Sequence, residues 1–343
     1  MISSGDRPPT KGGRRETAVK YRRLGRSGLL VSELCLGTMQ FGWTADEATA
    51  HHILDRAVNA GVNFIDTADV YSRWVDGNPG GVAEQIVGNW LAASSVRRDE
   101  VILATKVRGR MGEGPNDEGL SRHHILASAQ ASLRRLQTDH IDLYQLHYPD
   151  EDVAIEETLS ALDDLVRRGD VRTIGFSNFP AWRAVEALWE SDRRHLAAFT
   201  SSQPHYNLVH RREFEEEQEA VCRKYGLGVL PYSPLAGGFL TGKYARGEPP
   251  PEGTRAAAGG RVRQYLERPE MWRALEEVEK VGQSRGKSPS QVALAWLLAK
   301  PIVTSPIIGP RNLDQLEDNL GAMDVALTLE EIEALNSASA WSE

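Results

Sequence analysis

From residue 33 onward, short apolar runs alternate with longer segments in which apolar residues recur at helical spacing. The short runs predict buried strands, and longer segments such as "DEATAHHILDRAVNAG" and "IEETLSALDDLVRRGD" predict amphipathic helices. Several helical segments end in a glycine, the residue that most easily takes the left-handed conformation after a helix. These glycines are Gly61, Gly169, Gly226 and Gly286.

Eight strands are predicted, and they alternate with helical segments. They cover residues 32–37, 63–68, 101–107, 141–148, 171–178, 199–207, 228–234 and 302–309. Repetition of strand and helix predicts parallel strands with helical crossovers, and eight such units close into a (β/α)8 TIM barrel. An open doubly wound sheet is the alternative, but it requires a glycine-rich phosphate turn after a strand. The nearest candidate, "GLGVLP", lacks a third glycine and a following helix, so the closed α/β barrel is favoured.

The segment before the first barrel strand predicts a β-hairpin over residues 21–33. We place its turn near residues 26–28, with Gly28 at positive φ, and expect the hairpin to close one end of the barrel. The preceding residues are rich in glycine, proline and arginine and lack the apolar centre of a signal peptide. We therefore expect a flexible, basic N-terminal tail over residues 1–20 and a single barrel domain over residues 21–343.

Two insertions interrupt the regular repeat, over residues 72–81 after the second strand and over residues 235–269 after the seventh. Both follow strands, on the side of a barrel where loops carry chemistry. Extra helices are predicted over residues 288–300 and 328–340. The second begins with Thr328 and has a glutamate three residues on, which is a capping-box pattern.

Composition narrows the class of protein. The net charge of −8 argues against a nucleic-acid partner. The two cysteines, Cys35 and Cys222, are far apart and form no C-x-x-C motif, which favours a reducing, cytoplasmic environment. No apolar run approaches the length of a membrane span, so no membrane partner is expected.

Titratable residues follow three neighbouring predicted strands at the point where each ends. Asp66, Lys106 and His147 stand at the ends of the second, third and fourth strands, and Tyr71 lies on the loop after Asp66. By strand alternation, each of the three strand-end residues shares a face with apolar residues of its strand. Because carboxyl ends of barrel strands converge on one cavity, we expect these four side chains to meet there.

Together the four residues predict a proton donor. Lys106 beside Tyr71 favours the phenolate and is expected to lower the phenol pKa, while Asp66 holds Lys106 charged. His147 would orient a substrate oxygen, so that the group protonates a forming alkoxide. No metal is expected, because the paired histidines at residues 51–52 and 123–124 lack ligand spacing. A Schiff-base aldolase that uses Lys106 is an alternative, although Asp66 opposes the neutral amine it needs.

Six motifs carry a family resemblance: "GVNFIDTADVYS", "ATKV", "LHYPD", "GFSNF", "SPLAGGFLTGKY" and "PIIGPRNLDQLEDN". With these motifs in this order, the chain resembles an aldo-keto reductase over roughly residues 21 to 335, within the bacterial and potassium-channel-β-like branches. The resemblance implies an oxidoreductase that uses NADPH or NADP+ and acts on alcohol and carbonyl groups. It also implies that Asp66, Tyr71, Lys106 and His147 are catalytic.

The resemblance further implies where the cofactor lies. Ser177 and Asn178 would hold the nicotinamide carboxamide with Gln203 beside them, Tyr232 would stack on the nicotinamide ring, and the segment 233–243 would wrap the pyrophosphate. The implied contacts are Gly37, Thr38, Met39, Asp66, Ser177, Asn178, Gln203, Tyr232, Ser233, Pro234, Leu235, Gly237, Lys243, Gly309, Arg311, Gln315, Asp318 and Asn319.

The last of these motifs also supports a phosphate site from the residues themselves. It opens a helix directly after the eighth strand, and a helix N-terminus offers free N–H groups to a phosphate. Arg311 adds a guanidinium fork, so we expect it to contact the 2′-phosphate. Gln315 and Asn319, one and two turns later, would face the adenine.

The predicted substrate pocket is aromatic, with Trp43, Trp74 and Tyr148 on loops above the strand ends. We expect a small aldehyde, ketone or sugar-derived carbonyl as substrate. A cofactor-sensing regulatory subunit with little turnover is the non-enzymatic alternative, and the sequence leaves homo-oligomer formation open.

Overall fold

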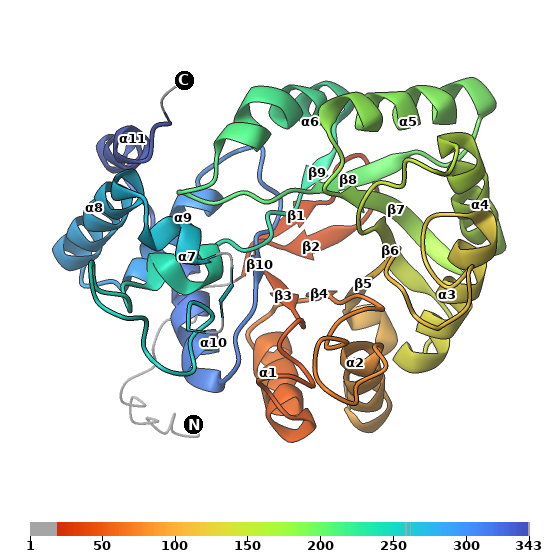
Figure 1. The fold of residues 1–343 in the computed structure, drawn as a ribbon, viewed down its shortest axis with the longest axis horizontal. Coiled ribbons are helices and arrows are strands. Elements are labelled where there is room, and N and C mark those ends of the chain that lie inside the picture. Colours follow the sequence, from red (N-terminus) through yellow and green to blue (C-terminus); the bar gives the residue numbers. More distant parts are fainter. Residues whose placement is uncertain (1–18, 258, 261, 342–343) are drawn as a thin grey trace, which may run out of the picture.

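The computed structural model describes residues 19–257, 259–260 and 262–341. The tail predicted over residues 1–20 lies outside this part of the chain, except for its last two residues. Eight parallel strands form one sheet, and helices surround it (Figure 1). In order along the sheet the strands are β10 (Ile307–Ile308), β3 (Cys35–Gly37), β4 (Phe64–Asp66), β5 (Ile102–Val107), β6 (Ile141–Leu146), β7 (Val171–Ser177), β8 (Phe199–Gln203) and β9 (Gly228–Val229).

Hydrogen bonds between β9 and the segment leading into β10 close the sheet. The amide of Thr304 donates to the carbonyl of Val229 at 2.8 Å, and the amide of Ile307 donates to the carbonyl of Pro231 at 2.9 Å. The barrel fold predicted from the strand–helix repeat is therefore confirmed. The strands are shorter than the apolar runs that predicted them, because Pro204 directly follows β8 and Pro306 directly precedes β10, and a proline has no amide to donate.

Most helices lie on the outside of the barrel, with their apolar faces on the strands. Gly169, Gly226 and Gly286 cap α4, α6 and α8 in the left-handed conformation, as the sequence predicted. Among the described residues, no helix has the length and apolar character needed to cross a membrane. The main helices are α1 (Glu47–Asn59), α2 (Val82–Ala93), α3 (Arg122–Leu136), α4 (Ile155–Arg168), α5 (Ala181–Arg194), α6 (Glu219–Tyr225), α8 (Pro269–Arg285) and α10 (Leu313–Leu320).

Short helical segments fill the insertions and the chain ends. The helix predicted over residues 328–340 is α11, and its capping box is formed by Thr328, whose hydroxyl accepts from the amide of Glu331. The helix predicted over residues 288–300 is α9. These and the remaining elements are α7 (Val262–Leu266), α9 (Pro289–Leu298), α11 (Leu329–Ala338), the 3-10 turns η1 (Arg98–Glu100), η3 (Ala236–Thr241) and η4 (Gly321–Asp324), and the π-helical turn η2 (Phe214–Gln218).

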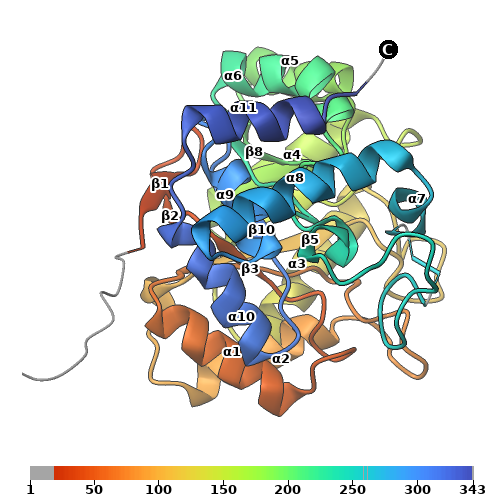
Figure 2. The same cartoon turned by 90° about the vertical axis from the view of Figure 1, so that its left-hand side faces the viewer.

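The N-terminal hairpin pairs β1 (Tyr21–Arg23) with β2 (Leu30–Ser32) in antiparallel register. Leu24 and Val31 pack inside the barrel, so the hairpin closes this end. Figure 2 shows the hairpin on one side of the molecule and α7, with the loop before it, on the other.

The conformation predicted for the hairpin turn was wrong, because the residue at positive φ is Gly25 (φ 54°) rather than Gly28. The chain passes so close to β8 that a β-carbon at Gly25 would lie 2.2 Å from the Thr200 carbonyl oxygen. Only glycine tolerates both that approach and that φ.

Candidate active site

The Lys106 ammonium forms the centre of a buried polar cluster at the carboxyl ends of the strands. Its Nζ donates to Oδ2 of Asp66 at 2.5 Å, to the Tyr71 hydroxyl at 2.9 Å and to the Thr67 carbonyl at 2.9 Å. The side chains of Lys106 and Asp66 are 0% and 2% exposed. Three of the four residues that the sequence proposed as catalytic therefore lie in one hydrogen-bonded group.

Two glutamines complete the shell around the Asp66 carboxylate. The Nε2 atoms of Gln145 and Gln203 donate to Oδ1 of Asp66 at 2.9 Å and 3.0 Å. Gln145 pairs with Lys106 in the register of β5 and β6, which brings both side chains into the barrel. Gln145 was not among the site residues predicted from the sequence, although its alternation with His147 in the predicted strand is the pattern that indicates it.

The phenol of Tyr71 lies over this cluster, on the loop that follows β4. The Lys106 Nζ is 4.8 Å from the centre of the Tyr71 ring, and the rings of Tyr71 and His147 are 6.0 Å apart. Burial raises the pKa of Tyr71, the Lys106 charge lowers it by less, and the Asp66 charge raises it further. The expectation of a lowered phenol pKa was wrong, because desolvation of the phenolate outweighs the ammonium.

The imidazole of His147 is neutral at physiological pH. Burial, the Lys106 charge and the Arg108 charge lower its pKa to about 3. A neutral imidazole carries one donor and one acceptor nitrogen, so His147 is able to donate a hydrogen bond to a substrate oxygen without adding charge.

Lys106 is held in the charged form. Burial alone would lower its pKa, but Asp66 and Tyr71 outweigh burial, so the pKa rises above its ordinary value. A Schiff-base mechanism needs a neutral amine, and this environment therefore disfavours the aldolase alternative.

A cavity of about 840 Å³ opens above this cluster. Thr38 does not line it, because its buried hydroxyl donates to the Asp66 carbonyl at 3.2 Å. All the other residues proposed to contact the cofactor do line it: Gly37, Met39, Asp66, Ser177, Asn178, Gln203, Tyr232, Ser233, Pro234, Leu235, Gly237, Lys243, Gly309, Arg311, Gln315, Asp318 and Asn319.

Polar side chains at the end of β7 and after β9 meet in the inner part of the cavity. The Tyr232 hydroxyl donates to Oδ1 of Asn178 at 2.8 Å. The Asn178 amide nitrogen donates to the His147 carbonyl and to the Ser177 hydroxyl, both at 2.9 Å. The ring of His205 is parallel to that of Tyr232, with 5.0 Å between their centres. These contacts fix the orientation of the flat Tyr232 ring in the cavity wall.

The outer part of the cavity carries three cations close together. Burial and the charges of Arg311 and Arg255 lower the pKa of Lys243, and burial and Arg311 lower that of Arg255. No ion pair joins any of the three to a carboxylate of the described residues, and Arg311 donates to the Gly253 carbonyl at 3.2 Å. A multiply charged anion fits this place, because it would neutralise all three. Arg255 was not predicted from the sequence, because it lies in an insertion without periodicity.

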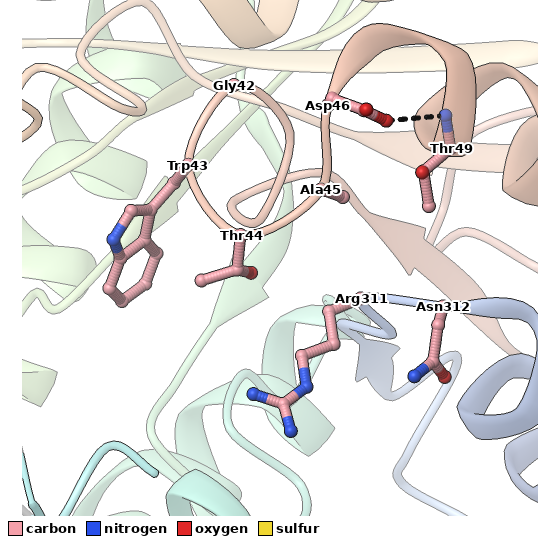
Figure 3. A pocket seen from close by; sticks show the side chains of 8 residues that line it. All are labelled: Gly42, Trp43, Thr44, Ala45, Asp46, Thr49, Arg311 and Asn312. Carbon is pink, nitrogen blue, oxygen red and sulfur yellow. Dashed lines mark hydrogen bonds between the residues drawn. The ribbon is translucent and has the colours of Figure 1, made fainter. Parts of the chain in front are cut away.

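A second hollow of about 610 Å³ lies between residues 42–49 and the start of α10 (Figure 3). Its one carboxylate, Asp46, already caps α1 by accepting from the Thr49 amide at 2.9 Å. The Arg311 side chain is directed away from Asp46 and Thr49, as Figure 3 shows. We assign no site to this hollow.

The aromatic side chains proposed for the substrate pocket surround the cavity mouth. Trp43 and Tyr148 line the cavity, and Tyr148 stacks on His147 with 5.2 Å between ring centres. Trp74 lies at the rim, where its ring packs edge-on against Trp43 and Tyr71 at 5.6 Å and 6.3 Å. Within the described ranges, no group of three or more His, Cys, Asp or Glu side chains is placed to hold a metal ion.

Comparison with known proteins identifies the class of protein that has this fold and site. The profile of the aldo/keto reductase family matches residues 33–340, so the chain belongs to this family.

Among its relatives is an uncharacterized oxidoreductase, YrpG, of Bacillus subtilis (strain 168), which is 42% identical over 322 residues, or 93% of this chain and 95% of that protein. A probable voltage-gated potassium channel subunit beta of Oryza sativa subsp. japonica is 36% identical over 90% of this chain and 92% of its own length. A versiconal hemiacetal acetate reductase of Aspergillus parasiticus is 34% identical over 92% of this chain and 96% of its own length. The family and the two relatives named as an oxidoreductase and a reductase support an oxidoreductase.

Proposed function

We propose that this chain is an NADP(H)-dependent carbonyl reductase in which Tyr71 is the general acid. The observation that carries the proposal is the chain of contacts from Asp66 through the Lys106 ammonium to the Tyr71 hydroxyl, at the base of the 840 Å³ cavity. The raised pKa keeps Tyr71 protonated at neutral pH, which is the form a proton donor needs.

The chain's own residues would orient and protonate the substrate. His147 donates a hydrogen bond to the carbonyl oxygen, and Tyr71 transfers its proton to that oxygen as negative charge develops. Lys106, 2.9 Å from the hydroxyl, then stabilises the phenolate that remains until solvent returns the proton. When bound, a reduced nicotinamide dinucleotide supplies the hydride that forms the new C–H bond.

The same cavity would hold that cofactor from end to end. Ser177, Asn178 and Gln203 would contact the carboxamide, and Tyr232 would support one face of the ring. Lys243, Arg255 and Arg311 would bind the phosphates, and the extra charge of a 2′-phosphate favours NADPH over NADH at this cluster. The three cations, which have no carboxylate partner in the part of the chain that the structure describes, support this assignment.

A cofactor-sensing role is the second candidate, since one relative is named a probable potassium channel subunit beta. We favour catalysis, because a complete Asp66, Tyr71, Lys106 and His147 set is unnecessary for sensing alone. The substrate would be a small aldehyde, ketone or sugar-derived carbonyl.

The test is turnover of a panel of aldehydes, ketones and sugars, followed by loss of NADPH absorbance, with NADPH affinity measured by fluorescence titration. Reduction of at least one carbonyl compound, faster with NADPH than with NADH, supports the proposal. Tight NADPH binding without turnover favours the sensing role. Labelling of Lys106 by borohydride and a carbonyl compound without nicotinamide would support the aldolase.

A further inference from the structure

Arg108 is a cation beside His147 that the proposed chemistry does not use. It follows β5 by one residue, and His147 follows β6 by one residue. The two strands pair in register up to Val107 and Leu146, so Arg108 and His147 leave the barrel side by side. The Arg108 charge is close enough to contribute to the lowered pKa of His147, after burial and Lys106.

The Arg108 guanidinium has no hydrogen-bond acceptor among the described residues. Its Nε is enclosed and makes no hydrogen bond, and no carboxylate forms an ion pair with the group. The neighbouring arginines differ: Arg110 pairs with Glu118 at 2.6 Å, and Arg73 donates to the Arg110 carbonyl. An enclosed N–H without an acceptor is costly. The Arg108 side chain as a whole is only half-buried, so we expect its other N–H groups to bind a ligand that supplies an acceptor.

The backbone of Arg108 is also unusual. Its φ is 140°, a value that L-residues other than glycine rarely adopt, and the Gly119 amide holds it by donating to the Arg108 carbonyl at 2.9 Å. Strained backbone of this kind persists where the surrounding structure enforces it, and it is concentrated at binding and catalytic sites. The strain and the unpartnered guanidinium are separate observations on one residue.

We infer that Arg108 recognises an acidic group on the substrate, so that the preferred substrates are carbonyl compounds carrying a carboxylate a short distance from the reacting carbonyl. A guanidinium binds a carboxylate through two parallel hydrogen bonds. Because adjacent strands are about 4.8 Å apart, a compound whose carbonyl lies at His147 reaches Arg108 with a short spacer. Tyr148, stacked on His147, provides an apolar wall for that spacer. This inference rests on the proposed reductase function.

The test compares carbonyl compounds that differ only in the acidic group. 4-Carboxybenzaldehyde is paired with methyl 4-formylbenzoate, and 4-oxobutanoate with its methyl ester. The wild-type protein should have the higher kcat/KM for the acid of each pair. Arg108→Gln should lower kcat/KM for the acids by about 10- to 100-fold, the scale of a lost charged hydrogen bond, and leave the esters unchanged. Arg108→Lys should retain part of the preference.

Arg110→Gln is the matched control, because it removes a guanidinium two residues away that is already ion-paired. Thermal unfolding and NADPH affinity of each variant report on folding and on the cofactor site. Equal wild-type rates for acid and ester, or an equal loss of both in Arg108→Gln, would overturn the inference while leaving the reductase function intact. Failure of the wild-type protein to reduce any carbonyl of the wider panel would overturn the proposed function, and the inference with it.

Discussion

Replacing Lys106 by methionine tests whether the Asp66–Lys106 pair is an electrostatic unit. The pair is completely enclosed, with an Nζ to Oδ2 distance of 2.5 Å and side-chain exposures of 0% and 2%. Lys106→Met leaves a buried carboxylate that retains only the amide donors of Gln145 and Gln203. Loss of one partner from a buried pair costs about 3–5 kcal/mol, and the remaining donors place the expected loss near 3 kcal/mol.

The interaction free energy between Asp66 and Lys106 is best measured by a double-mutant cycle. Asp66→Asn leaves a buried ammonium and should be destabilising on a similar scale, whereas the combined variant buries no net charge. We therefore expect the combined variant to be no less stable than the worse single variant, with a coupling free energy of at least about 2 kcal/mol. Thermal midpoints should fall by roughly 2 °C per kcal/mol in a chain of this size.

The assay is urea unfolding followed by tryptophan fluorescence, together with thermal unfolding by circular dichroism. Lys280→Met is the control, because Lys280 is 76% exposed and pairs with Glu277 at the surface, where ion pairs contribute little. A combined variant whose loss equals the sum of the two single losses would refute the reasoning, because the two charges would then act independently.

Three further predictions concern the site. Tyr71→Phe should reduce turnover by about 10²- to 10⁴-fold with unchanged NADPH affinity, because only the proton donor is lost. Tyr148→Phe is the control, and it should retain turnover because the Tyr71 donor is still present. A loss of NADPH affinity equal to the loss of turnover in Tyr71→Phe would mean that Tyr71 is structural. Arg311→Gln should weaken NADPH by about 1–3 kcal/mol in a fluorescence titration and leave NADH unchanged, with the exposed, ion-paired Arg268→Gln as control. Parallel weakening of both cofactors would contradict a 2′-phosphate contact. His147 has a folded pKa of about 3, below the unfolded value of roughly 6.5, so the unfolded chain binds more protons between these values. Relative to His147→Asn, the wild-type free energy of unfolding should fall as pH drops through this window, by up to about 1.4 kcal/mol per unit, and parallel pH curves would contradict the assignment.

The amino-acid sequence by itself determined the barrel and the strand ends that form its mouth. Hydrophobic periodicity is local, so the strand–helix repeat, the Thr328 capping box and the Gly169 helix end could all be predicted. Alternation along parallel strands was sufficient to predict that the side chains of Asp66 and Lys106 meet, because the carboxyl ends of barrel strands converge. The positions of most residues proposed for the cofactor followed from the same strand ends.

Only the tertiary structure decided properties that depend on distant neighbours. The Thr200 carbonyl excludes a β-carbon at Gly25, which is also the hairpin-turn residue at positive φ, and no local pattern contains that contact. The direction of the Tyr71 pKa depends on how completely the fold desolvates the phenol, a quantity set by every element around the cavity. Arg255 joins Lys243 and Arg311 through a loop with no periodicity, and Arg108 is left without an acceptor by the absence of nearby carboxylates among the described residues. Hydrophobic periodicity specifies which face of a helix or strand is buried. The pKa of a side chain, its desolvation and its closest contacts depend on the residues, distant in the sequence, that pack against that face.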